Sequence, residues 1–135
     1  MRKFTLTLKV LVIASIGFFI YQALFAPVET GQNMKSVDWL PADATNVTFH
    51  LESQFGWTRE YTCQINEKSF RKFASEEDWA LKPIANEKVF LKKIMSEEIT
   101  INKGLVYIHK QNNGGGKYIH YDLDTETLYY FAAHR

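Results

Sequence analysis

A continuous apolar stretch, Val10–Ala26, constrains this chain of 135 residues more than any other feature. Helices that cross a bilayer need roughly 20 apolar residues. Phe4–Leu8 extends the stretch to that length, because the long side chain of Lys9 can return its ammonium group to the lipid headgroups. We therefore expect residues 1–26 to form a transmembrane anchor, with the lipid bilayer as its partner.

The distribution of charge around this stretch predicts its orientation. Every basic residue of the segment lies within its first nine residues, whereas the first charge after it is Glu29. Because basic residues stay on the cytoplasmic side, we expect a single-pass protein of the cell membrane with a cytoplasmic N-terminus and an extracytoplasmic C-terminal domain. A cleaved signal sequence is the alternative, although Tyr21 and Leu24 occupy positions where the peptidase prefers small residues.

The segment Lys3–Phe18 resembles the N-terminal helix of type IV pilins and pseudopilins, in which Phe-Thr-Leu precedes an apolar run. The resemblance is limited to this helix and implies a pilin-like envelope subunit. Lys3 stands where the prepilin peptidase uses glycine, and Leu8 stands where assembly uses a buried glutamate.

The remainder of the chain is long enough for one small domain. We expect a tether over residues 27–41, which are rich in polar residues and glycine, followed by a domain over 42–135. Trp39 and Leu40 are expected to mark the point where the tether docks onto this domain. From Pro27 onward there are 13 Lys and Arg against 15 Asp and Glu, so the balance predicts no nucleic-acid partner. The single cysteine, Cys63, cannot form an intramolecular disulfide and is predicted to be a buried small hydrophobe.

Local patterns predict an α+β domain with one hairpin, one helix and one meander. Apolar residues alternate along Val47–Leu51 and Trp57–Ile65, on either side of a glycine turn, as in an antiparallel hairpin. Asn66 is a typical N-cap for a helix that carries Phe70 and Ala74 on one face, and Trp79 is expected to turn back into the core after this helix. The final part predicts a four-strand antiparallel meander over Ile99–Ile101, Leu105–Gln111, Lys117–Leu123 and Leu128–Ala133.

Pairing Gln111 with Lys117 and Leu123 with Leu128 assigns the two faces of this meander. One face is expected to lie under the helix. The other would gather an apolar and aromatic surface, which we predict as a candidate interaction surface unless Trp39-Leu40 or the Asn86–Ser96 stretch covers it. Its residues are Val106, Ile108, Tyr118, His120, Tyr129 and Phe131.

The same register argues against a metal or cofactor. His109 and His120 fall on opposite faces, so they share no metal site. The acidic turn at Asp122–Glu126 lacks the EF-hand pattern, and such turns form for backbone reasons alone. Catalysis would need acid and base residues that come together only in the fold, such as His120 with Asp122 and Glu126, or His50 with Glu52.

Scattered positions of the predicted domain are similar to those of small exported or membrane-anchored bacterial proteins of uncharacterised function. They include Leu40-Pro41, Ile65-Asn66-Glu67, Tyr121-Asp122 and Tyr130-Phe131. This group implies no activity. We therefore expect a non-catalytic, membrane-anchored binding or accessory domain, with another envelope protein as a partner; the alternatives are a small exported hydrolase or lyase and the pilin-like subunit.

Overall fold

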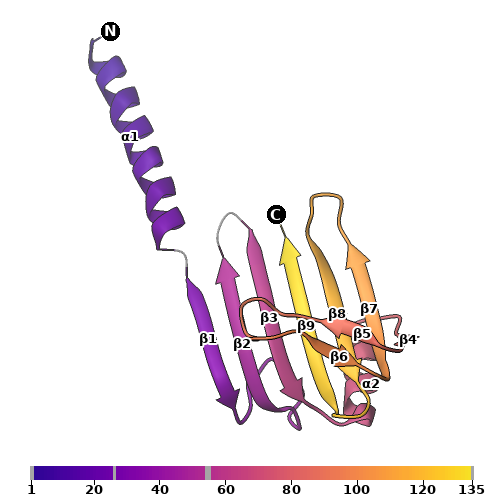
Figure 1. The fold of residues 1–135 in the computed structure, drawn as a ribbon. Coiled ribbons are helices and arrows are strands. Elements are labelled where there is room, and N and C mark those ends of the chain that lie inside the picture. Colours follow the sequence, from indigo (N-terminus) through magenta and orange to yellow (C-terminus); the bar gives the residue numbers. More distant parts are fainter. Residues whose placement is uncertain (1, 26, 54–55, 135) are drawn as a thin grey trace.

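The computed structural model describes residues 2–25, 27–53 and 56–134, and strands predominate in it (Figure 1). Seven strands form one antiparallel sheet in the order β1-β2-β3-β9-β8-β7-β4, and β5 pairs with β6 in a separate small sheet. The predicted α+β class is therefore wrong, because the chain builds a mostly β fold with one packed helix. The elements are α1 (Arg2–Leu24), β1 (Val28–Met34), β2 (Thr45–Ser53), β3 (Trp57–Gln64), α2 (Glu67–Glu76), β4 (Lys82–Ile84), β5 (Glu87–Val89), β6 (Ile99–Ile101), β7 (Gly104–Lys110), β8 (Gly116–Asp122) and β9 (Thr127–His134).

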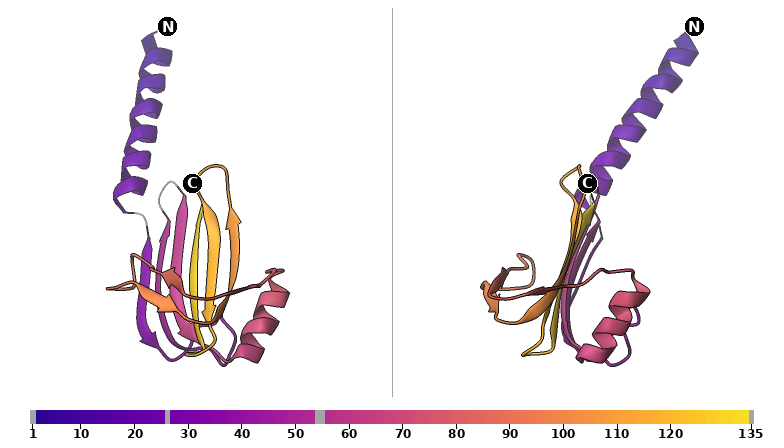
Figure 2. Two further views of the ribbon diagram at one scale, coloured as in Figure 1. Left: turned by 45° about the vertical axis from the view of Figure 1, so that its right-hand side comes forward. Right: turned by 90° about the vertical axis from the view of Figure 1, so that its right-hand side faces the viewer.

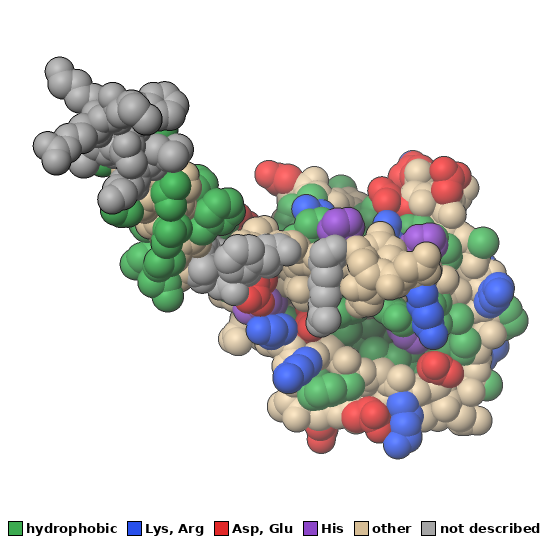
Figure 3. All heavy atoms as spheres, turned by 90° about the horizontal axis from the view of Figure 1, so that it is seen from above, with side chains coloured by type: hydrophobic (Ala, Val, Ile, Leu, Met, Phe, Trp, Pro, Cys, Tyr) green, Lys and Arg blue, Asp and Glu red, His purple; other side chains and the backbone are tan. Residues whose placement is uncertain are grey.

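The predicted single-pass anchor is also wrong, and so is the location in the cell membrane that depended on it. Within the described ranges, no helix combines the length and the apolarity that crossing a bilayer requires. The apolar run from Val10 to Phe25 is shorter than the roughly 20 residues that a span needs. Phe4–Leu8, invoked to lengthen it, have side chains outside the described part of the chain. α1 extends away from the sheet, with exposed apolar side chains along it (Figure 3).

Part of the predicted tether belongs to the sheet. β1 pairs with β2 from Val28 opposite Glu52 to Met34 opposite Val47, and its side chains are almost all exposed. An edge strand exposed in this way needs no alternation of apolar and polar residues, which explains why its sequence resembled a linker. The predicted docking of Trp39-Leu40 is confirmed, because Leu40 is buried and the Trp39 ring contacts the sheet.

The centre of the sheet joins two parts of the chain that are far apart in sequence. The predicted hairpin is formed by β2 and β3, and β3 then pairs with β9 along its whole length. The predicted four-strand meander is wrong in its first strand. Only β7, β8 and β9 form it, because β6 pairs with β5 and the edge position beside β7 is taken by β4.

The register of the meander differs from the predicted one, but the faces do not. Lys117 pairs with His109 instead of Gln111, and Leu128 pairs with Tyr121 instead of Leu123. Each strand is therefore displaced by two residues. Because side chains alternate along a strand, a displacement of two leaves every side chain on its predicted face.

Helix α2 covers one end of one sheet face (Figure 2). Asn66 is its N-cap as predicted, since the side-chain Oδ1 accepts a hydrogen bond from the backbone N–H of Ser69 at 3.0 Å. Phe70 and Ala74 are buried against the sheet, and the Phe70 ring stacks on Tyr121 with a centroid separation of 4.2 Å. The main hydrophobic core therefore lies between α2 and the middle strands.

The opposite face of the sheet is covered by β5, β6 and the segment between them (Figure 2). Val89 and Leu91 from this segment are buried, as is Val106 of β7, and all three lie outside the main core cluster. The chain thus passes around the sheet between α2 and β5 and places one layer on each face.

The end of α2 uses aspartate where glycine is usual. Asp78 has φ 56°, and the backbone N–H groups of Asp78 and Trp79 donate to the carbonyls of Ser75 and Ala74. These are the two hydrogen bonds of a Schellman motif, in which the left-handed residue is most often glycine. The motif also includes an apolar contact, here between the rings of Phe73 and Trp79 at 5.1 Å.

Asp78→Gly is expected to raise the free energy of unfolding by about 1 kcal/mol, because glycine adopts positive φ without the steric cost that a Cβ imposes. Urea unfolding followed by far-UV circular dichroism measures the change. Asp78→Ala also removes the charge but retains the Cβ, so it should not raise the free energy of unfolding. Equal effects of the two substitutions would contradict the backbone explanation.

Candidate functional site: an aromatic cavity beside the helix end

A cavity of about 330 Å³ opens on the helix side of the sheet, next to the end of α2. Leu51, Arg59 and Glu77 form part of its wall. The remaining wall consists of aromatic side chains from four separate parts of the chain. These are Trp39, Tyr61, Phe73, Trp79 and Tyr130.

The floor of the cavity is buried and rigidly packed. Tyr61, Trp79 and Tyr130 are 5%, 6% and 8% exposed. The rings of Tyr61 and Tyr130 stack at 4.3 Å and 13°, because these residues are direct partners across β3 and β9. Trp39, at 44% exposed, closes one side with its ring edge-on to Tyr61 at 5.0 Å. The cavity thus has a fixed aromatic floor and an accessible aromatic rim.

Two opposite charges share this cavity without binding each other. Arg59 and Glu77 are both exposed, and none of the ion pairs among the described residues involves either of them. Both charges act on the floor. Burial raises the pKa of Tyr61 and of Tyr130, Glu77 adds to the rise of both pKa values and Arg59 opposes it. The two phenols are therefore neutral at pH 7.

The cavity wall makes two cation–π contacts, one through the ring of Trp79 and one through the guanidinium group of Arg59. The Nζ of Lys117 lies 5.6 Å from the centroid of the Trp79 ring, and the Cζ of Arg59 lies 5.2 Å from that of Trp57. Both separations are within the range of cation–π attraction. The indole Nε1 of Trp79 is buried and has no hydrogen-bond acceptor among the described residues.

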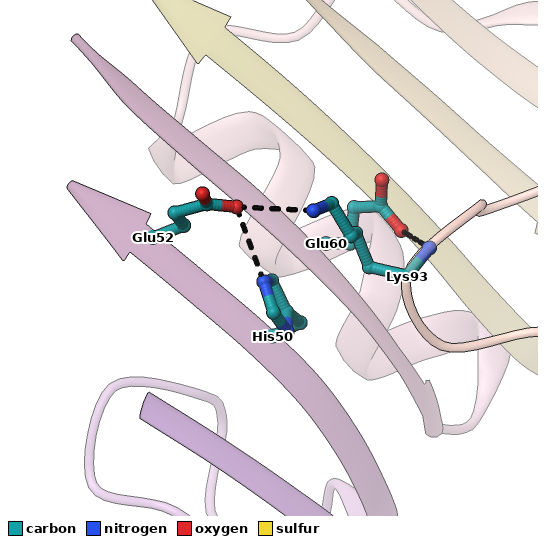
Figure 4. A network of polar contacts seen from close by, with 4 residues as sticks. All are labelled: His50, Glu52, Glu60 and Lys93. Carbon is teal, nitrogen blue, oxygen red and sulfur yellow. Dashed lines mark hydrogen bonds and ion pairs between the residues drawn. The ribbon is translucent and has the colours of Figure 1, made fainter. Parts of the chain in front are cut away.

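The opposite face of the sheet carries a polar network that contains one of the predicted catalytic pairs (Figure 4). His50 Nε2 and Glu52 Oε2 lie 3.3 Å apart, as neighbours on the same face of β2. The same Glu52 oxygen lies 3.3 Å from Lys93 Nζ, and the backbone N–H of Lys93 donates to the buried carboxylate of Glu60 at 2.7 Å. His50 and Glu52 are thus brought together, but the carboxylate of Glu52 is already paired with the ammonium group of Lys93 from the covering segment.

We expect the ion pair between Glu52 and Lys93 to make stability depend on pH. Hydrogen bonds from His50 and Lys93 lower the pKa of Glu52 below its usual 4.5. A lowered pKa gives stability that is present above the unfolded-state value and is lost as the pH falls through the folded-state value. Glu52→Gln should therefore cost about 0.5–1 kcal/mol at pH 6 and progressively less toward pH 3.

Urea unfolding of both proteins between pH 6 and pH 3 measures this difference. Glu97→Gln is the matched control, because Glu97 is exposed and makes no ion pair among the described residues. A loss that stays constant over this pH range would contradict the role assigned to the Glu52 carboxylate.

The other predicted catalytic group is not assembled. Asp122 Oδ1 accepts from the backbone N–H of Asp124, and Glu126 Oε1 accepts from the backbone N–H of Glu67 at the start of α2. In the described structure no hydrogen bond or ion pair joins His120 to either carboxylate. Burial lowers the pKa of His120, with Glu87 opposing the shift.

The predicted interaction surface lies on the face that β5 and β6 cover. Val106 is buried, and His120 and Tyr129 are half-buried. Tyr118 and Phe131 are also half-buried and contact each other with ring centroids 5.8 Å apart, while Ile108 is 46% exposed. The Asn86–Ser96 stretch, which was given as a possible cover for this surface, belongs to the layer that lies over it. A role of the surface in binding stays a prediction.

Cys63 is buried, and burial raises the pKa of its thiol to about 12. The thiol is therefore protonated at pH 7 and is not a nucleophile, as predicted for a small buried hydrophobe. Among the described residues, no cluster of three or more His, Cys, Asp or Glu side chains is arranged to hold a metal ion.

The sequence did not predict the cavity, although it did predict where two of its aromatic side chains pack. It predicted that Trp39 docks on the domain and that Trp79 turns back toward the core, and the structure confirms both. The pairing of β3 with β9, which sets Tyr61 against Tyr130, had no signal in the sequence. No family model, no curated protein and no solved structure matches this chain.

Proposed function

We propose that this protein is a non-catalytic binding domain and that the aromatic cavity is its ligand site. The observation that carries the proposal is the convergence of five aromatic side chains around one cavity with a buried floor. Small-molecule sites are typically concave, largely aromatic and equipped with a few polar groups that orient the ligand. Arg59 and Glu77 supply such groups here.

A binding role fits the cavity better than a catalytic one. The two neutral phenols, the arginine and the glutamate include no activated nucleophile, and the histidine and carboxylate in contact lie on the other face of the sheet. Pockets for drug-sized ligands have volumes of roughly 300 Å³ or more. This cavity, at about 330 Å³, lies at the lower end of that range, so its volume suits a ligand of about one ring or an equivalent branched group.

Trp39→Ala is expected to weaken the binding of small apolar fragments about tenfold, because a large aromatic wall is lost at the rim. Phenol and cyclohexanol are suitable neutral probes. Two-dimensional NMR of the labelled protein should show chemical-shift changes confined to the cavity residues, with the dissociation constant read from the titration.

Phe90→Ala is the matched control. Phe90 is 50% exposed, close to the 44% of Trp39, but it directly follows β5 and is not part of the cavity wall. Equal weakening by both substitutions, or shift changes spread over the whole sheet, would overturn the assignment of the site.

A further inference from the structure

The charges of the cavity are arranged for a ligand that carries both signs. Arg59 comes from β3 and Glu77 from the end of α2, so they approach the cavity from the sheet and from the helix. No ion pair among the described residues involves either side chain, so neither charge is neutralised by a protein group of opposite sign. A ligand that bears a cation and an anion would satisfy both at once.

The aromatic walls favour a particular kind of cation. Tryptophan, tyrosine and phenylalanine faces attract quaternary ammonium groups, and sites that enclose such groups from several sides are built from these residues. Three of the rings here form a fixed floor, and two more stand at the side. A quaternary ammonium group has no N–H to donate, so it needs no hydrogen-bond acceptor and is well served by aromatic faces and one carboxylate.

A carbohydrate is a poorer match. Sugar hydroxyl groups need several hydrogen-bonding side chains around the edge of the ring. Besides its two charged groups, this wall offers only phenol and indole groups, and those of Tyr61, Trp79 and Tyr130 belong to the buried floor. A neutral aromatic ligand would match the floor but would leave Arg59 and Glu77 without a charge of opposite sign.

Resting on the proposed function, we propose that the cavity binds a small zwitterion with a quaternary ammonium group. The aromatic rings and Glu77 hold the ammonium end, and Arg59 holds the anionic end. Binding involves no covalent change in the ligand.

Three probes of one shape separate the contributions. γ-Butyrobetaine carries a trimethylammonium group and a carboxylate, butyltrimethylammonium lacks the carboxylate, and 5,5-dimethylhexanoate replaces the ammonium group with a neutral tert-butyl group. Isothermal titration calorimetry with the full chain should show the zwitterion binding about tenfold or more tighter than either single-charge compound, which corresponds to about 1.4 kcal/mol per lost interaction.

Substitutions of the two charged residues separate the contribution of the cation site from that of the anion site. Glu77→Gln should weaken γ-butyrobetaine and butyltrimethylammonium about tenfold and leave 5,5-dimethylhexanoate unchanged. Arg59→Gln should weaken γ-butyrobetaine and 5,5-dimethylhexanoate and leave the cation unchanged. Glu76→Gln and Arg71→Gln make the same changes of charge on exposed parts of α2 outside the cavity and should have no effect. Thermal unfolding confirms that each variant is folded.

The outcomes distinguish this inference from the proposed function. If the anion binds as tightly as the zwitterion, or if Glu77→Gln changes nothing, the ammonium assignment is overturned while the cavity stays a ligand site. If phenol and cyclohexanol bind but all three of these probes fail, the zwitterion is overturned in the same way. If no fragment of either series binds, both proposals fail.

Discussion

Replacing Phe70 with alanine is expected to lower the free energy of unfolding by about 3–5 kcal/mol, the usual loss for a fully buried phenylalanine. Phe70 is 0% exposed, and its ring lies 4.2 Å from that of Tyr121 with an interplanar angle of 5°. The Tyr121 hydroxyl in turn donates to the carbonyl of Ile65 at 2.8 Å. Truncation at Phe70 therefore leaves a void in the layer that joins α2 to the sheet.

Urea unfolding followed by circular dichroism measures the loss, with the slope of the transition as a check that the unfolded state is unchanged. Phe70→Leu keeps most of the volume and should cost clearly less than the alanine variant. A loss below about 1 kcal/mol for Phe70→Ala would show that α2 contributes little to the core, against the burial observed here.

Gly104→Ala should cost about 3 kcal/mol, at the upper end of the range for overpacking. Gly104 opens β7 and is flanked on both sides, by Ile84 of β4 and by Asp122 of β8. A Cβ at this position would collide with the backbone carbonyl oxygen of Tyr121 and would lie 2.7 Å from the Cγ2 of Ile101. A carbonyl in a paired strand cannot move aside, so the strands must separate.

Gly17→Ala makes the same chemical change in α1, where no atom lies within 4 Å of the added methyl group, and should not destabilise the domain. Denaturant unfolding of both variants gives the comparison. An effect of Gly104→Ala no larger than that of Gly17→Ala would contradict the close approach of the strands at Gly104.

Local patterns in the sequence were sufficient for most of the strands and for α2. The alternation in β2, β3, β7, β8 and β9 was legible, as was the N-cap at Asn66, because each depends on neighbours within a few residues. The faces were correct even though the register was displaced by two, since alternation fixes a face but not a partner. β1 was missed because its exposed edge position leaves no apolar alternation.

Long-range pairing was beyond such patterns, and the candidate site depends on it. Tyr61 and Tyr130 are separated by most of the domain in sequence, and only the pairing of β3 with β9 stacks their rings. The meander alone assigns the predicted surface to one face, but alternation cannot decide whether another segment covers that face, as β5 and β6 do. The apolar run of the N-terminal segment was overvalued, because the prediction depended on extending it through Phe4–Leu8.

The position of β9 has a consequence for how the chain is made. In the described sheet this strand is the only neighbour shared by β3 and β8, so without it the remaining six strands fall into two groups of three. During synthesis those groups emerge first, and nothing in the described sheet joins them until β9 has left the ribosome. A chain that ends before Thr127 would therefore expose two unpaired strand edges, the feature that most readily leads to aggregation.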